Sequence, residues 1–305
     1  MKVLITGAGG MLGQDLVKAL SRHHEVIPLV TDRSGAGTED APAILNESLV
    51  NRVFTATRPE VVIHAAAYTD VDGAETNQAE AHAVNVLGTA RIAEASVNAK
   101  AVLFYISTDY VFDGLKSGSY EEADAPNPIG IYGKTKLAAE RELSSRYGLN
   151  GAIYIIRTSW LFGAGGKNFF RSILRLASER DTLRVVNDQK GAPTYTKDLA
   201  EVFQVLIEKA KRKNGCHIYH LANAGVTTWY EAAARLLEKA HFTGKLLPLR
   251  SDELNRPAKR PANSVLNMSK IQKAFGIRMR SWETALDEFW NEVLRHEWES
   301  QIKTR

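Results

Sequence analysis

Apolar residues in the first half of the chain follow two alternating patterns. Short continuous apolar runs, which are typical of buried strands, are separated by longer segments in which apolar residues recur every three or four positions. In one such segment Leu12, Leu16 and Leu20 fall on the same face of a predicted helix. Strands are predicted at residues 2–6, 25–30, 61–65, 101–107 and 152–156, and helices at residues 11–23, 49–57, 79–98 and 134–147.

This alternation predicts an α/β fold of the Rossmann type, a doubly wound parallel sheet with helices on both faces. After about Arg157 the alternation loosens, and loops rich in glycine, proline and asparagine appear. We expect residues 1–156 to form a dinucleotide-binding domain. Residues 157–305 should mainly form a smaller, mixed α/β substrate-binding lobe, with some segments packing back onto the first domain. Helices of this second half are predicted at residues 169–179, 198–213, 230–239 and 282–298.

Composition and charge narrow the class of partner. The 305 residues include 39 basic and 35 acidic side chains, a net charge of +4, which suits an anionic small substrate. The basic run at residues 209–213 ends a predicted helix, where cations complement the helix dipole, so no nucleic-acid partner is expected. No apolar stretch is long enough to cross a membrane. Because Cys216 is the only cysteine, we expect a reducing, cytoplasmic location.

A glycine-rich turn joins the first predicted strand to the first predicted helix. Gly7 permits the tight turn, Gly10 lets the backbone approach a pyrophosphate, and Gly13 lets the helix pack closely on the strand. The backbone N–H groups at the helix start, including those of Met11 and Leu12, are then free to bind phosphate. Because strand, turn and helix fall in the required order, the segment predicts a dinucleotide site.

Two further segments are expected on the cofactor. Asp32 and Arg33 stand about 20 residues beyond the turn, where the ribose 2′-position should lie. An aspartate there favours the 2′-hydroxyl of NADH and an arginine the 2′-phosphate of NADPH, so the cofactor is expected to be NADPH, with NADH as the other option. Ala65, Ala66 and Ala67 end a buried strand, and their small side chains leave room either for the dinucleotide or for tight helix packing.

Tyr132 and Lys136 stand four residues apart at the start of a predicted helix, which puts both on one face. The ammonium, reinforced by the positive nicotinamide ring, is expected to stabilise the phenolate and to lower the tyrosine pKa from its usual ~10. The preceding strand runs into Thr108, whose hydroxyl would hydrogen-bond a substrate carbonyl as charge develops on its oxygen. The spacing alone is typical of a helix surface. With the strand and hydroxyl in order, it predicts a reductase centre.

Here the chain resembles the dTDP-4-dehydrorhamnose reductases, a family within the extended short-chain dehydrogenase/reductase superfamily. The resemblance covers most of the chain, from Met1 to about Phe289. It rests on the segments GAGGMLG, HAAAYTDVDGAE, NVLGT, STDYVFDG, YGKTKLAAE, RTSWLFG, GAPTYTKDLA and RPANSVLN.

The resemblance implies hydride delivery from the nicotinamide cofactor to C4 of dTDP-4-dehydro-L-rhamnose, a step in making dTDP-L-rhamnose for cell-wall polysaccharide. It makes Tyr132 the general acid, Lys136 its modulator and a ribose contact, and Thr108 the group that polarises the carbonyl. The sugar pocket would be lined by Asp109, Tyr110 and Trp160, with Arg260 on the nucleotide diphosphate. Trp160 could equally be a core residue that follows a strand.

Two departures from the family pattern are visible. An aspartate-rich segment near the adenine is replaced by AILNE, after a polar stretch at residues 34–42. Some members dimerise through a magnesium ion; Asp15 could be one ligand, but Lys197 falls where another acid would be needed. We therefore predict no metal, while a homodimer stays an option.

Two other functions remain open at this stage. A sugar-nucleotide dehydratase on this scaffold needs an Asp-Glu pair after the threonine, whereas Asp109 is followed here by Tyr110. An epimerase retains its cofactor through the reaction cycle, which a sequence reports poorly. A non-catalytic, reductase-like regulatory subunit such as that of methionine adenosyltransferase would bind the dinucleotide without consuming it, because fold does not fix function.

Overall fold

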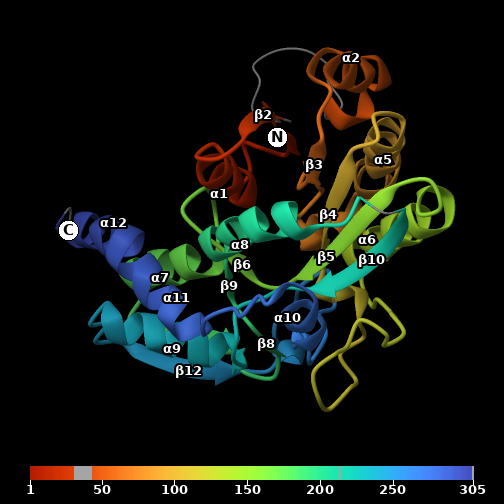
Figure 1. The fold of residues 1–305 in the computed structure, drawn as a ribbon. Helices are drawn as coiled ribbons and strands as arrows, with labels where there is room; N and C mark the ends of the chain where they lie inside the picture. Colours follow the sequence, from red (N-terminus) through yellow and green to blue (C-terminus); the bar gives the residue numbers. More distant parts are fainter. Residues whose placement is uncertain (31–42, 213, 304–305) are drawn as a thin grey trace.

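A six-stranded parallel sheet forms the centre of the computed structural model, which describes residues 1–30, 43–212 and 214–303. The strand order is β10-β5-β4-β3-β1-β2 (Figure 1). The strands are β1 (Lys2–Thr6), β2 (Glu25–Leu29), β3 (Val61–His64), β4 (Val102–Thr108), β5 (Ala152–Thr158) and β10 (Gly215–His220). The predicted doubly wound α/β fold is confirmed, and the order reverses between β1 and β3, where such sheets bind ligands beyond the carboxyl ends of their strands.

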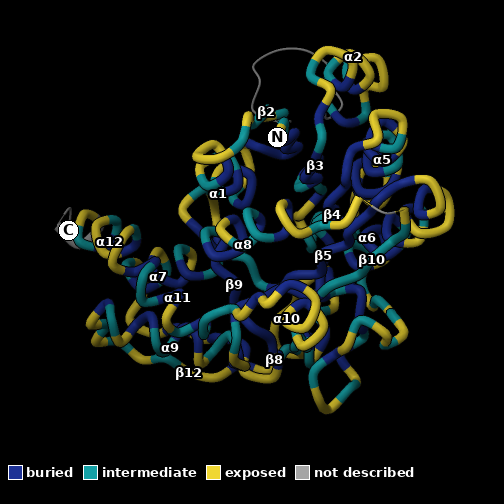
Figure 2. The backbone as a smooth tube through the Cα atoms, in the orientation of Figure 1, coloured by how far each residue is buried: buried dark blue, intermediate teal, exposed yellow. Residues whose placement is uncertain are grey.

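Helices cover both faces of this sheet. One face carries α1 (Met11–Leu20), α8 (Thr196–Lys209) and α10 (Ser269–Phe275), and the other carries α2 (Glu47–Thr57), α5 (Thr89–Asn98) and α6 (Ile131–Glu142). The predicted apolar face of α1 is buried, because Leu12, Leu16 and Leu20 pack with Phe203 of α8 in one hydrophobic core. The inner strands β1, β3, β4 and β5 are buried along nearly their whole length, whereas the edge strands β2 and β10 are mostly only partly buried (Figure 2).

Several predicted boundaries differ from the structure. The helix predicted at residues 79–98 consists of α4 (Gln78–His82), a wider π-helical turn (Ala83–Gly88) and α5. A π-helical turn (Trp290–Leu294) likewise separates α11 (Trp282–Phe289) from α12 (Arg295–Lys303), and another (Leu143–Tyr147) extends α6. Each is a single wider turn within or at the end of an α-helix, too short for the apolar period to reveal it. The helix α3 (Val71–Thr76) and the sixth strand β10 were not predicted.

A second hydrophobic core lies beneath the carboxyl edge of the sheet. It joins α7 (Phe169–Glu179), β7 (Thr182–Val186), α9 (Trp229–Lys239), α11 and β12 (Lys245–Leu249), where β7 and β12 pair in parallel. Two short strand pairs lie alongside: β6 (Leu161–Phe162) with β9 (Thr194–Tyr195), and β8 (Lys190–Gly191) with β11 (Thr227–Thr228). Although α8, β10 and α10 come late in the sequence, they pack on the central sheet (Figure 1). The domain boundary at residue 157 stays a prediction.

Within residues 1–30, 43–212 and 214–303, no helix is both long enough and apolar enough to span a membrane.

Replacement of Leu16 by alanine should destabilise the fold, because the side chain is fully buried between α1 and the sheet. The free energy of unfolding should fall by about 3 kcal/mol. The exposed Leu149, a leucine outside any core, is the matched control and should change it by less than about 0.5 kcal/mol as alanine. Urea unfolding followed by circular dichroism measures both. Equal effects of the two substitutions would contradict the packing of α1 described above.

Candidate active site

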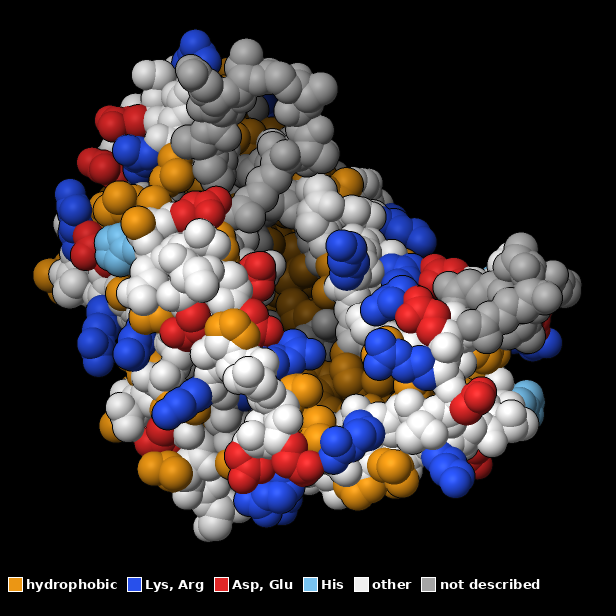
Figure 3. All heavy atoms as spheres, turned by 180° about the vertical axis from the view of Figure 1, so that it is seen from behind, with side chains coloured by type: hydrophobic (Ala, Val, Ile, Leu, Met, Phe, Trp, Pro, Cys, Tyr) orange, Lys and Arg blue, Asp and Glu red, His pale blue; other side chains and the backbone are white. Residues whose placement is uncertain are grey.

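A cavity of about 620 Å³ lies beyond the carboxyl ends of β1, β3, β4 and β5. It opens on the face seen in Figure 3, where the molecule is hollowed and hydrophobic side chains form the floor. Segments that follow the strands supply most of its wall, and Lys167 and Trp229, from later in the chain, complete it. Fourteen predicted site residues line it: Gly7, Gly10, Met11, Leu12, Gly13, Ala65, Ala66, Ala67, Thr108, Asp109, Tyr110, Tyr132, Lys136 and Trp160.

Three predicted residues are not among the lining residues. Asp32 and Arg33 lie outside the described part of the chain. The guanidinium of Arg260 is held 2.9 Å from the Asp72 carboxylate, and it also hydrogen-bonds Tyr110, which does line the cavity. Arg260 therefore contacts the lining residue Tyr110 but does not line the cavity itself, because its guanidinium binds Asp72 on α3.

The glycine turn has no room for side chains. Gly7 has a φ of +69°, and a Cβ atom there would lie 2.6 Å from the backbone nitrogen of Ala66. A Cβ atom on Gly13 would lie 2.1 Å from the carbonyl oxygen of Gly7. The first turn of α1 is therefore pressed against the turn that precedes it, with Gly10 as its N-cap. This leaves backbone N–H groups facing the cavity, a cradle that fits a pyrophosphate.

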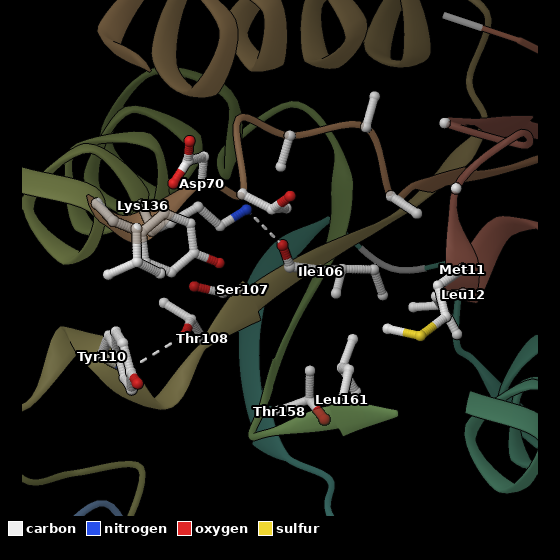
Figure 4. Close-up of a pocket in the computed structure, with 18 of the residues that line it drawn as sticks. Met11, Leu12, Asp70, Ile106, Ser107, Thr108, Tyr110, Lys136, Thr158 and Leu161 are labelled. Carbon is white, nitrogen blue, oxygen red and sulfur yellow. Dashed lines mark hydrogen bonds between the residues drawn. The ribbon is translucent and has the colours of Figure 1, made fainter. Parts of the chain in front are cut away.

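Helix α6 brings Tyr132 and Lys136 to the cavity from one helix face. It approaches closely because Gly133 has no side chain: a Cβ atom there would lie 2.1 Å from the carbonyl oxygen of Tyr110. The Lys136 ammonium donates a 2.6 Å hydrogen bond to the carbonyl oxygen of Ile106 on β4 (Figure 4). It also lies 4.1 Å from the centre of the Tyr105 ring. Burial lowers the pKa of Lys136 to about 7, and the Glu140 carboxylate opposes this fall.

The proton of Tyr132 is held more tightly than the sequence predicted. Burial raises the pKa of Tyr132 to about 12; a hydrogen bond with Thr108 opposes the rise and the charge of Asp109 adds to it. The expected lowering by Lys136 is therefore wrong for this geometry, because the ammonium turns toward Ile106 and desolvation dominates. Tyr132 is thus protonated near neutral pH, which leaves it the part of proton donor, but a donor with a pKa this high needs its phenolate to be stabilised as it forms.

The end of β4 supplies the polar wall of the cavity. The Thr108 hydroxyl donates to Asp109 Oδ1 at 3.0 Å and accepts from the backbone N–H of Tyr110 at 3.2 Å, the latter bond drawn in Figure 4. Burial raises the pKa of Asp109 to about 7, and hydrogen bonds from Ser264 and Thr108 oppose the rise. The Tyr110 ring meets the Tyr132 ring edge to face. Three consecutive residues thus place three different polar groups at one point of the cavity.

The indole rings of Trp160 and Trp229 stack against each other in the wall of the cavity. The Trp160 and Trp229 ring centres lie 3.5 Å apart with an angle of 8° between the planes. Trp160 has a left-handed φ of +47°, and Gly191 leaves the space for its ring. Trp160 lines the cavity, and its contact with substrate stays a prediction. Trp229 was missed, because nothing in the sequence marks the first residue of α9 as a neighbour of β5.

Other lining residues were also missed by the sequence analysis. They are Ile44, Thr69, Asp70, Val71, Val84, Ile106, Ser107, Thr158, Ser159, Leu161 and Lys167. Several directly follow predicted strands, so the rule that ligands bind at carboxyl ends of strands could have found Thr69, Asp70, Thr158 and Ser159. Asn85, in the π-helical turn, fixes this wall from behind by accepting from Tyr68 N and donating to Thr135 Oγ1.

The residues considered for a metal are engaged otherwise. Asp15 accepts a hydrogen bond from Thr196, and the Lys197 ammonium lies between Glu288 and Glu292. In the described part of the chain, His, Cys, Asp and Glu side chains nowhere gather in threes close enough to hold an ion. The prediction that no metal is used stays a prediction.

Comparisons with known proteins match most of the chain. A family model described as "RmlD substrate binding domain" matches residues 1–295. The chain is 41% identical over 295 residues to a dTDP-4-dehydrorhamnose reductase of Aggregatibacter actinomycetemcomitans, covering 93% of this chain and 97% of that one. It is 40% identical to the Streptomyces griseus reductase, over 93% of this chain and 91% of that one.

Solved structures agree with these matches. A crystal structure of dTDP-4-dehydrorhamnose reductase from Bacillus anthracis, in complex with NADP, matches with a TM-score of 0.87 and 36% identity, over 96% of this chain and 99% of that one. A UDP-glucose 4-epimerase from Brucella ovis matches with a TM-score of 0.77 over 93% of this chain and 95% of that one. Its identity is 20%, so it shows a shared fold alone.

Substitution of Gly13 by alanine should weaken dinucleotide binding at least about tenfold, since a Cβ atom would force α1 away from the glycine turn. Titration of NADPH by protein fluorescence measures the dissociation constant. Gly118 is the matched control, because a Cβ atom there meets nothing within 4 Å. If the Gly13 variant bound NADPH as tightly as the Gly118 variant, the turn would not be the pyrophosphate site.

Proposed function

The chain belongs to the RmlD substrate-binding-domain family, and from this premise we propose that it reduces the C4 keto group of dTDP-4-dehydro-L-rhamnose to give dTDP-L-rhamnose. NADPH is its cofactor, in keeping with the NADP complex of the Bacillus anthracis relative. One observation carries the proposal: Thr108, Tyr132 and Lys136 meet on a cavity whose other wall is a glycine turn shaped for a pyrophosphate.

The residues divide the work of the reaction between them. When bound, NADPH supplies the hydride that C4 receives. Thr108 hydrogen-bonds the C4 carbonyl oxygen and stabilises the negative charge that develops there. Tyr132 gives its proton to that oxygen, which completes the alcohol. Lys136 keeps one N–H on the Ile106 carbonyl oxygen, and its other N–H groups stabilise the phenolate on Tyr132, an anion that exists only once the proton has been given up.

Simple reduction is favoured over elimination. A dehydratase needs a second carboxylate beside Asp109, but the next residue is Tyr110. Burial raises the pKa of Tyr110 well above its ordinary value, with Asp109 adding to the effect, so this phenol is a poor base. A regulatory subunit would have no need of Thr108, Tyr132 and Lys136 together on one cavity.

The remaining assignments complete the proposal. Residues 157–305 serve mainly as the substrate lobe, and Asp109, Tyr110 and Trp160 contact the sugar nucleotide, with Arg260 near its diphosphate. The cavity's mixed wall, with the cation Lys167 beside paired indoles, supports an anionic ligand that carries rings. We place the protein in the cytoplasm, where its single thiol stays reduced, and we retain the homodimer as an expectation.

Isotope transfer tests the reaction directly. With dTDP-4-dehydro-L-rhamnose and NADPH deuterated at C4 of the nicotinamide, the sugar should gain one deuterium at C4, and one NADP⁺ should form per sugar. Nuclear magnetic resonance and nicotinamide absorbance measure the two quantities, and parallel assays with NADH give the cofactor preference. An epimerase would consume no cofactor overall, a dehydratase would release water, and a regulatory subunit would bind NADPH unchanged. Each of these results would overturn the proposal.

Loss of the Tyr132 hydroxyl should slow catalysis without loosening the cofactor. We expect Tyr132→Phe to lower kcat about 10²- to 10⁴-fold, because the proton donor is gone, and to leave the dissociation constant of NADPH within about threefold. Tyr147→Phe is the matched control, since Tyr147 is a buried tyrosine outside the cavity. Steady-state kinetics and NADPH titration measure both effects. Undiminished turnover in Tyr132→Phe would exclude Tyr132 as the acid.

A further inference from the structure

A buried ion pair lies behind the reacting residues. The Arg157 guanidinium binds the Glu140 carboxylate through Nη2 at 2.7 Å and through Nε at 3.0 and 3.2 Å. Arg157 is 1% exposed and Glu140 is 3% exposed, so the pair is out of contact with solvent. The guanidinium also lies over the Phe112 ring. Neither side chain lines the cavity, so neither can touch the substrate.

A serine connects this ion pair to Lys136. The Ser107 hydroxyl donates a 2.5 Å hydrogen bond to Oε1 of Glu140. Ser107 follows Ile106, whose carbonyl oxygen accepts the 2.6 Å hydrogen bond from the Lys136 ammonium. The peptide group between these two residues is therefore fixed to Glu140 on one side and to Lys136 on the other. Glu140 is also one helical turn beyond Lys136 on α6, on the same face.

Lys136 faces few charged or titratable groups. From α6 it faces Glu140, from β4 the Tyr105 ring and from β3 His64, and Tyr132 lines the same cavity. On β5 the charged side chain is Arg157, which is paired with Glu140. Burial lowers the pKa of His64 to about 3, and its ring hydrogen-bonds Thr6 and Thr89, so it is neutral. Asp109 acts on Tyr132 and is not among the charges that shift the pKa of Lys136. Glu140 is accordingly the carboxylate that supports the Lys136 charge among the described residues.

We propose that Glu140 is a positioning residue that keeps Lys136 charged and, through Ser107, holds the Ile106 carbonyl group that orients the ammonium. This inference rests on the proposed reductase function, in which Lys136 must be an ammonium. Glu140 does not line the cavity itself, but it binds Ser107, which does. Arg157 fixes the Glu140 carboxylate in place through its Nε and Nη2 atoms, since a buried charge without a partner is costly.

The buried location of the pair is consistent with this role. A buried ion pair gains little stability over well-packed apolar side chains, because both charges lose their hydration. Apolar residues at these positions would serve the core of α6 and β5 equally well. They would, however, leave Lys136 without a carboxylate, while burial already lowers its pKa to about 7.

Glu140→Gln isolates the charge, since the amide oxygen can still accept from Ser107. Lys136 is charged below its pKa and loses the charge as the pH rises through it. Without Glu140 that pKa falls, and the Arg157 charge lowers it further. The alkaline limb of the kcat/KM profile should therefore move to lower pH by about one unit. Ser107→Ala isolates the hydrogen bond: kcat should fall severalfold while the limb stays in place.

A matched control and a second variant make the test decisive. Glu297→Gln removes a carboxylate from another two-point pair, with Arg171, away from the cavity, and should leave the profile unchanged. Arg157→Gln removes the partner that fixes the Glu140 carboxylate, so Lys136 loses its support and the limb should again move to lower pH, a result that also serves if Glu140→Gln does not fold. An unmoved limb in a folded Glu140→Gln or Arg157→Gln protein would overturn the inference.

Titration of the lysine itself separates this inference from the proposed function. The pKa of Lys136, followed by ¹⁵N nuclear magnetic resonance and assigned with Lys136→Arg, should be lower in Glu140→Gln than in the unsubstituted protein. This reading needs no substrate. If the unsubstituted protein shows no turnover of the keto sugar, the proposed function fails, whatever the titration gives. If turnover occurs and the Lys136 pKa is the same in both proteins, the positioning role fails alone.

Discussion

An ammonium group buried at the end of a parallel sheet is the constraint on which the site depends. Lys136 has one backbone acceptor, Ile106, and an aromatic face, Tyr105, in place of water. Desolvation favours its neutral form, and only a fixed anion nearby can offset that tendency. Glu140, buried in an ion pair with Arg157, is the anion that offsets it. The positive charge of Lys136 is thus maintained by side chains that do not line the cavity.

Close backbone contacts give the site its precision. Gly13 lets α1 press on the glycine turn, and Gly133 lets α6 press on the carbonyl group of Tyr110. Each contact joins an element that carries a functional group to a strand end, with no flexible side chain between them. The two walls of the cavity, one for phosphates and one for proton transfer, are therefore set by the same rigid sheet. A site built on such elements can hold its geometry more closely than one built on loops.

The sequence predicted those parts of the structure that rest on local pattern. Strands β1 to β5 and the buried face of α1 follow from apolar periodicity, and Gly7 to Gly13 follow from turn chemistry. Residues whose role comes from tertiary neighbours were not found. Glu140 looks like any helix glutamate until β5 brings Arg157 to it, and Trp229 is distant in sequence from Trp160. The pKa of Tyr132 was predicted in the wrong direction, because burial is not visible in a four-residue spacing.

The late segments of the chain connect the two hydrophobic cores more than once. Helix α8, strand β10 and helix α10 pack on the central sheet, although segments of the second core precede them in the sequence. The chain therefore crosses between the two cores several times. The indoles of Trp160 and Trp229, which come from segments far apart in the sequence, stack in the wall of the cavity. Such a cavity can enclose its ligand while Tyr132 and the glycine turn keep fixed positions relative to each other.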